Sequence, residues 1–268
     1  MGTYIRLVDY GSQQEKENAF LVAVENKTIN KIKFNPSSNN FSKIPGSPIA
    51  YWVSDNFANN YKEKRIGDYS EVITGMTIGD NNKYLRLWYE INKNTICIGE
   101  SSMNNVNISK TKWIPYSKGG PRRNWYGNYE YVVNWSQKDN FNRSKTTLQH
   151  LYLREAITWP FITSGDFSAR YLPCGFLWDV AGSPCFFNNK SDLSYTLSLL
   201  TSKVANYILK VVNPTINVQA VDISQIPLIK KENSSEHIKA ISNESVKISQ
   251  EDWDSFETSW DFKKNPLI

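Results

Sequence analysis

Hydrophobic positions recur along the chain at two spacings, which predict both helices and strands. From Asp192 to Val212 the apolar residues lie three or four positions apart, which is the period of an amphipathic helix. Ser191 is the candidate N-cap of this helix, and Asn213-Pro214 is its stop signal. Directly afterwards, Thr215–Val221 alternates apolar and polar residues, which is typical of a half-buried strand.

Shorter segments show the same two patterns. Helices are predicted at Ser12–Val24, Ala50–Lys64 and Ser235–Ile248. Strands are predicted at Thr3–Asp9, Tyr84–Ile91 and Tyr129–Trp135, with several short ones within Ile157–Asp179. A hairpin is predicted within Thr111–Trp135, and its strongest turn signal is Gly119-Gly120-Pro121. We therefore expect an α+β protein with mixed or antiparallel sheets and flanking helices.

Composition places the chain among globular proteins. It has 268 residues, of which 40% are hydrophobic and 13% aromatic, unlike a disordered chain. No apolar run approaches the ~20 residues of a membrane span, and the N-terminus has no signal-peptide core. Three cysteines, Cys97, Cys174 and Cys185, are an odd number and predict free thiols in a reducing compartment. We expect a cytoplasmic protein that does not contact a membrane.

The net charge of +5 is concentrated in one stretch. Residues 110–145 hold eight basic and two acidic residues, net +6, together with three tryptophans and four tyrosines. In one interpretation, the basic residues contact nucleic-acid phosphates while the aromatic residues pack against sugars. In the other, an antiparallel sheet packs a Trp/Tyr face and leaves a charged face in water. The last 20 residues carry net −3, so we expect them to lie away from any polyanion.

Motifs for common catalytic chemistries are missing from the sequence. It contains no G-x-G, no phosphate-binding GK[ST] and no Pro-Pro, the dipeptide found in the motif of amino-methyltransferases. His150 and His237 are isolated, and Cys174 and Cys185 lack the spacing of zinc ligands, so no metal site is predicted. No G-x-S-x-G supports a Ser/His/Asp hydrolase. The chain is therefore predicted to bind rather than to catalyse.

One long block resembles a known family. Lys112–Asn128, with the sequence KWIPYSKGGPRRNWYGN, resembles the KW-x-PY-x-KGG-xx-R-x-WYGN signature of PglX-type proteins. These are the adenine-specific DNA methyltransferases of BREX phage-defence systems. Further segments follow in the order of that family's C-terminal half: Ile5–Ser12, Ile44–Ser54, Gly75–Glu90, Ile157–Pro173, Leu199–Pro227 and Glu251–Phe262. The resemblance covers essentially the whole chain.

The resemblance implies that this chain is the target-recognition region of such a protein. Its expected parts are an N-terminal α+β part (1–110), a DNA target-recognition core (111–230) and a helical, acidic connector (231–268). Leu199–Pro227 also resembles the end of target-recognition domains in Type I specificity subunits, whose fold is therefore expected here. The catalytic domain, with its S-adenosylmethionine loop and Asn-Pro-Pro-Tyr, is expected outside this chain.

The resemblance also implies what this fragment can do. It is expected to bind no cofactor and to be inactive alone, whereas its parent is expected to be an adenine-specific DNA methyltransferase that uses S-adenosylmethionine. Two positions depart from the family pattern. Ile78 stands where G-x-x-TGDN has threonine, so a hydroxyl contact there is in doubt. Val221 stands where NPTLNFQVGDI has glycine, so this position is expected to need no positive φ.

The charges and the resemblance together predict a domain that binds double-stranded DNA and reads a short asymmetric site. Phosphate contacts are predicted for Lys112, Lys118, Lys138, Lys145 and Arg154. Base-edge contacts are predicted for some of Arg122, Arg123, Asn124, Asn128 and Arg143. Trp125 and Tyr126 are expected to pack on the DNA backbone or support the duplex, although Trp125 fits a core position equally well. Arg170 is either a phosphate contact or the partner of a buried carboxylate.

Two other functions fit the same features. The chain can instead be a protein-interaction platform that binds other BREX components or an acidic, DNA-mimicking phage inhibitor. A carbohydrate-binding module suits the Trp, Tyr and Asn content, but the clustered charge and the missing export signal count against it. The expected partners are double-stranded DNA and the methyltransferase domain, with other BREX proteins or an inhibitor as the alternative.

Overall fold

The computed structural model describes residues 2–25, 31–230 and 232–267, and the chain divides into two compact units, Met1–Lys64 and Arg65–Ile268. The division lies at residues 64–65, because residues 70–87 supply one strand to each sheet of the second unit. The parts 1–110, 111–230 and 231–268 that the resemblance implied stay a prediction.

The first unit is built from two short strands and a capped helix. Strand β1 (Tyr4–Ile5) pairs antiparallel with β2 (Lys33–Phe34), and helix α1 (Gln13–Glu25) lies between them in sequence. The Glu15 N–H donates to Ser12 Oγ (3.2 Å), and the Ser12 N–H donates to the Glu15 carboxylate (2.9 Å). This capping box confirms the predicted helix start at Ser12.

The second helix of this unit is shorter than predicted. Helix α2 covers Asp55–Asn59 and continues as a 3₁₀ turn at Asn60–Lys62, whereas the sequence pattern predicted a helix from residue 50 to 64. Ser54 is the reason for the late start, because its hydroxyl accepts from the Phe57 N–H (3.2 Å) and so caps the helix there.

Two four-stranded sheets form the second unit. The first sheet is antiparallel, in the order β3 (Ser70–Val72), β10 (Pro184–Phe187), β7 (Ala156–Thr158) and β8 (Arg170–Leu172). The second has the order β4 (Leu85–Leu87), β6 (Tyr131–Asn134), β5 (Trp113–Ser117) and β9 (Leu177–Trp178), with β5 and β9 parallel. The predicted hairpin is the antiparallel pair β5–β6. The predicted α+β class with mixed and antiparallel sheets is confirmed.

The two sheets share one hydrophobic core. Val133 and Trp178 of the second sheet pack in the same cluster as Leu172 and Phe186 of the first. Five of the nine tryptophans are buried, so tryptophan contributes strongly to the interior. Burying one large apolar side chain stabilises the fold by about 1.5–3 kcal/mol, which makes this core the main support of the unit.

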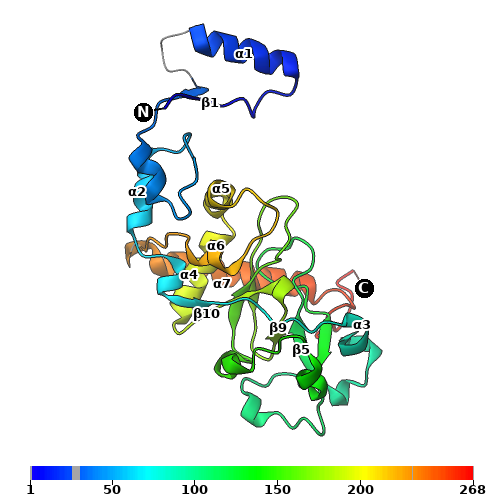
Figure 1. Cartoon of the computed structure of the whole chain (residues 1–268). Helices are drawn as coiled ribbons and strands as arrows, with labels where there is room; N and C mark the ends of the chain where they lie inside the picture. The colour runs from blue at the N-terminus through cyan, green and yellow to red at the C-terminus, as the bar shows by residue number, and fades with distance from the viewer. Residues whose placement is uncertain (1, 26–30, 231, 268) are drawn as a thin grey trace. The chain divides into compact units, whose positions relative to one another are not determined.

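Helices α4 (Lys190–Leu200), α6 (Ala220–Ser224) and α7 (Glu232–Trp253) lie together beside the first sheet, and α3 (Asn81–Tyr84) lies beside the second (Figure 1). Helix α7 extends beyond the predicted Ser235–Ile248 at both ends.

No helix in the described part of the chain is long and apolar enough to cross a membrane. Cys97 and Cys185 are buried free thiols and Cys174 is an exposed one, as predicted, and burial raises the pKa of Cys185 to about 12.

The long helix predicted for residues 192–212 is two helices, α4 and α5 (Lys203–Val212). Ser202 separates them, because its hydroxyl donates to the Leu199 carbonyl (2.6 Å) and accepts from the Ala205 N–H (3.3 Å). Helix α4 begins after Asn189 rather than Ser191, and the predicted stop at Asn213 is confirmed.

The predicted strand Thr215–Val221 is wrong. In this segment Asn217 forms only an isolated bridge with Ile162, and α6 begins at Ala220. The Asp222 carboxylate accepts from the Gln219 N–H (2.7 Å) and from the Asn213 side-chain amide (2.6 Å), which caps the helix.

Candidate nucleic-acid interface

Residues 118–130 connect β5 with β6 and form the β5–β6 loop, which lies along one edge of the first sheet. The Trp125 N–H donates to the Ala169 carbonyl (2.9 Å), and the Tyr171 N–H donates to the Trp125 carbonyl (2.8 Å). Trp125 thereby forms a parallel bridge with Arg170 on β8, an edge strand. Main-chain hydrogen bonds therefore fix the loop, and the loop covers the edge.

Left-handed backbone conformations explain the glycines of this loop. Gly119 has a φ of 81° and Gly127 a φ of 116°. A Cβ on Gly119 would lie 2.1 Å from the Ala181 carbonyl oxygen, so close packing also excludes a side chain there. Two non-glycine residues, Trp125 (φ 71°) and Asn128 (φ 65°), are held in the same region. The shape of the loop therefore requires the glycines of KGG and WYGN.

An ion pair with a buried carboxylate anchors the first residue of the loop. The Asp179 side chain is 2% exposed and accepts from Lys118 Nζ (2.7 Å), the Tyr116 hydroxyl (3.0 Å) and the Ala181 N–H (2.9 Å). Burial, followed by the Asp179 charge, raises the pKa of Tyr116 well above its ordinary value, so the phenol remains a neutral donor. Lys118 Nζ also donates to the Asn81 side-chain oxygen (3.2 Å). The Lys118 ammonium is thus engaged within the protein.

Arg170 and Asn128, both predicted DNA contacts, lie inside the protein. Arg170 is fully buried, its Nη2 donates to the Gly119 carbonyl oxygen (2.7 Å), and burial lowers its pKa. In the described part of the chain no carboxylate pairs with it, so neither role predicted for Arg170 matches this position. The buried Asn128 amide donates to the carbonyls of Gly119 (3.2 Å) and Pro121 (2.9 Å). Both side chains shape the loop from within.

The acidic C-terminal segment lies against the same loop. Arg123 Nη1 donates to Asp252 Oδ2 (3.0 Å), and the guanidinium carbon lies 5.1 Å from the centre of the Trp253 ring. Tyr126, a predicted DNA contact, is buried, and burial first and then Asp254 and Asp261 raise its pKa. The negative charge of this segment predicted that it lies away from any polyanion, yet Asp252 partners a residue predicted to contact DNA.

The outer side of the loop exposes basic and polar side chains. Arg122 is exposed, and its Nε donates to the Asp166 carbonyl (3.2 Å). Arg123 has 30% of its side chain exposed, and Asn124 and Trp125 are half-buried. A guanidinium has five N–H donors, so both arginines keep donors that can contact a phosphate or a guanine edge.

A neighbouring segment links the loop to a further basic residue. Thr77 exchanges main-chain hydrogen bonds with Arg143 (2.9 and 3.0 Å), while Asn81 contacts Lys118. Residues 77–81 therefore connect Arg143 with the β5–β6 loop. Lys145 follows with a φ of 58°, and burial, followed by the charge of Arg143, lowers its pKa.

Comparison with known proteins finds relatives along the whole chain. No protein-family model matches it. Over its full length it is 38% identical to the adenine-specific methyltransferase PglX of Lacticaseibacillus casei (strain Zhang), of which it covers 23%. It is 35% identical to the adenine-specific methyltransferase BrxX of Escherichia coli O9:H4 (strain HS), of which it covers 21%. The chain matches a segment of PglX-type methyltransferases. It spans about a fifth of the length of these two relatives, and the resemblance seen in the sequence motifs is confirmed.

Three PglX-type motifs that lie far apart in sequence contact the β5–β6 loop. Asn81 from the segment 75–90, Arg170 from 157–173 and Asp252 from 251–262 each contact a residue of the loop. The two departures from the PglX-type pattern lie elsewhere. Ile78 is 1% exposed and packs in the core, and Val221 lies in α6.

Three predicted contacts lie apart from the loop. Lys112 precedes β5, and Lys118 follows it, so their main chains lie roughly 20 Å apart along the strand. Lys138 lies in the 3₁₀ helix Trp135–Asn140 after β6 and pairs with its neighbour Asp139 (3.5 Å). Arg154 Nη2 donates to the Phe187 carbonyl at the end of β10 (3.1 Å).

The residues that hold the loop were not all predicted. Asn81 and Asp252 stand in sequence motifs and Asp179 stands outside them, yet nothing in the sequence connects any of the three with Lys118 or Arg123. A depression of about 400 Å³ beside Lys118 is lined by Asn81, Asn82 and Arg86, whose amides and guanidinium suit polar recognition.

In the described residues, no group of three or more His, Cys, Asp or Glu side chains can hold a metal ion.

Proposed function

We propose that residues 65–268 are the target-recognition region of a PglX-type methyltransferase and dock on double-stranded DNA through the outer side of the β5–β6 loop. The observation that carries this proposal is the construction of the loop. A motif of the family forms a loop with a fixed backbone, and its two adjacent arginines, Arg122 and Arg123, reach the surface. Fixed arginines suit recognition because little side-chain freedom is lost on binding.

The proposed contacts fall into three groups. Arg122, Arg123, Asn124, Trp125 and Arg143 face the duplex, with Lys145 and the exposed part of Lys118 beside them. Tyr126, Asn128 and Arg170 are buried and keep the loop in shape. Lys112, Lys138 and Arg154 lie outside the interface. Arg122 and Arg123 contact phosphates, which position the domain, and Asn124 and Arg143 read base edges.

The wider role follows from the relatives. In the full-length parent, the methyl donor S-adenosylmethionine binds the catalytic domain, outside this chain. The recognition region holds the duplex while that domain turns the target adenine out of the helix. We further propose that the parent serves BREX phage defence in the cytoplasm, and that this chain alone transfers no methyl group.

An electrophoretic shift of a random duplex over a salt series tests the proposal. We expect a shift at low salt that weakens steeply as salt increases, because phosphate contacts release bound counterions. The absence of a shift at any salt concentration would contradict it.

A second candidate is the binding of an acidic protein, such as a DNA-mimicking inhibitor. The Arg123–Asp252 pair favours it, because one arginine of the loop already forms an ion pair with a protein carboxylate. Binding of an acidic protein, together with no DNA shift, would favour this candidate.

A further inference from the structure

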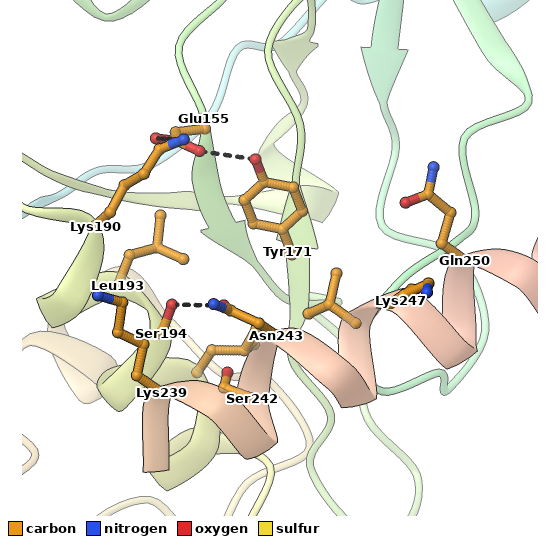
Figure 2. Close-up of a pocket in the computed structure, with 12 residues that line it drawn as sticks. Glu155, Tyr171, Lys190, Leu193, Ser194, Lys239, Ser242, Asn243, Lys247 and Gln250 are labelled. Atoms are coloured by element: carbon orange, nitrogen blue, oxygen red, sulfur yellow. Dashed lines mark hydrogen bonds and ion pairs between the residues drawn. The ribbon is translucent and has the colours of Figure 1, made fainter. Parts of the chain in front are cut away.

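A cavity of about 310 Å³ lies between α4 and α7 on one side and Glu155 and Tyr171 on the other (Figure 2). None of the residues on the outer side of the β5–β6 loop lines it, so the cavity is separate from the proposed DNA surface. Small-molecule sites have volumes of roughly 300–1,000 Å³, so this cavity suits a small ligand.

One part of the cavity wall is apolar. Leu193 and Leu197 of α4 and Val246 of α7 line it, and the Tyr171 ring closes it from the sheet side (Figure 2). A cavity of about 150 Å³ lined by such side chains holds a benzene ring. The larger volume here leaves room for a ring that carries a polar substituent.

Two polar side chains in the cavity have unused hydrogen-bonding capacity. The Ser242 hydroxyl is buried and has no hydrogen-bond partner among the described residues. The Asn243 side-chain oxygen accepts from the Ser194 hydroxyl (3.1 Å), which leaves its NH₂ group to donate to a ligand. A ligand oxygen would satisfy these donors, and satisfying a buried hydroxyl is favourable.

The one carboxylate of the cavity is already engaged. Glu155 accepts from the Tyr171 hydroxyl (2.7 Å) and lies 3.4 Å from Lys190 Nζ. This carboxylate therefore has partners of its own and does not pair with the remaining lysines of the cavity.

Those remaining lysines are Lys239 and Lys247, which lie about two turns apart on α7. Each has an acidic neighbour on its own helix, Glu236 or Glu251, but only at 3.8 Å and with both acids exposed. Such surface pairs contribute little and exchange readily. Both ammonium groups are therefore available to a bound anion.

We propose that this cavity binds a small organic anion, a carboxylate or a phosphate carried on an apolar body about the size of one ring. Lys239 and Lys247 recognise the charge, Ser242 and Asn243 donate hydrogen bonds to it, and the leucines and Val246 surround the apolar body. Either acid group fits this chemistry, so probes of both kinds belong in the test.

The test is calorimetric titration of the full chain with phenyl phosphate, benzoate and the uncharged benzyl alcohol at constant ionic strength. We expect at least one of the anions to bind with a Kd of roughly a few millimolar, which is typical of ligands of this size, and the alcohol to bind more weakly than that anion. The tighter anion identifies the acid group. Failure of both anions to bind, or equal binding of the alcohol, would overturn the proposal.

Variants locate the binding. Lys239→Gln with Lys247→Gln should raise the Kd about tenfold, whereas the matched pair Lys263→Gln with Lys264→Gln should leave it unchanged. Ser242→Ala should raise the Kd about threefold without lowering the urea midpoint, because it removes a hydroxyl that has no partner. Equal weakening by both lysine pairs, or an unchanged Kd in all variants, would show that the anion binds elsewhere.

Discussion

The two ends of the β5–β6 hairpin carry the same kind of charge but are held very differently. At the loop end, Lys118 is bound to the buried carboxylate of Asp179, and the main chain is bonded to β8. At the opposite end, Lys112 is exposed, and Lys138 pairs with Asp139, whose side chain is 83% exposed. A count of charges along the sequence treats both ends alike. The comparison teaches that equal charges along the sequence can have unequal partners, because a buried carboxylate holds Lys118, whereas Lys112 is exposed and the partner of Lys138 lies in water.

The largest expected effect comes from breaking the loop end at Gly119. Gly119→Ala should lower the free energy of unfolding by about 4 kcal/mol, because its Cβ would meet the Ala181 carbonyl and its φ is positive. Urea unfolding followed by tryptophan fluorescence measures the change.

Gly99 is a matched control, since its φ is 82° and nothing lies within 4 Å of its added Cβ. Gly99→Ala should therefore lower the free energy of unfolding by only about 1 kcal/mol. Equal losses in the two variants would mean that close packing does not hold the loop end.

Next in size is the removal of one lysine from each end of the hairpin. Lys118→Met leaves Asp179 buried without its cation and should cost about 3 kcal/mol of unfolding free energy. Lys138→Met removes an exposed pair and should cost less than about 0.5 kcal/mol. The same urea experiment measures both, and a cost for Lys138→Met as large as that for Lys118→Met would abolish the distinction between the ends.

The smallest effect concerns the acidic neighbour of the loop. Asp252→Ala should change the free energy of unfolding by less than about 1 kcal/mol, because its pair with Arg123 is largely exposed. It should strengthen DNA binding about twofold to threefold, since a carboxylate beside the loop repels phosphates. Fluorescence anisotropy of a labelled duplex measures the affinity, and weaker binding would instead mean that Asp252 orients Arg123 for contact.

Local signals in the sequence predicted much of this fold. Ser12 marked the start of α1, the turn glycines marked the β5–β6 hairpin, and Asn213 marked the end of α5. Each of these depends on residues within a few positions. The alternative of a packed Trp/Tyr sheet face also describes Trp113 of β5 and Tyr116 of β5 correctly, because both are buried.

The remaining features depend on contacts that no local pattern contains. Arg170 is buried because it binds the Gly119 carbonyl, 51 positions away in the chain. Asp179 similarly lies far from Lys118 in sequence, so charge counting showed Lys118 as a free cation. The split at Ser202 had no visible signal, because a serine within an amphipathic pattern either stays in the helix or caps a new one. The sequence identified the motif residues, but it did not show which of their side chains face outward.

The most direct test of the DNA-binding surface compares two double variants of equal charge change. Duplex affinity is measured over a salt series for the unaltered chain, for Arg122→Ala with Arg123→Ala, and for Lys112→Ala with Lys138→Ala. We expect the arginine pair to flatten the dependence of log K on log salt by about two units, roughly 0.9 for each lost phosphate contact, and the lysine pair to leave the slope unchanged. An unchanged slope in the arginine pair, or equal slopes in both pairs, would contradict the assignment of the β5–β6 loop to the DNA interface.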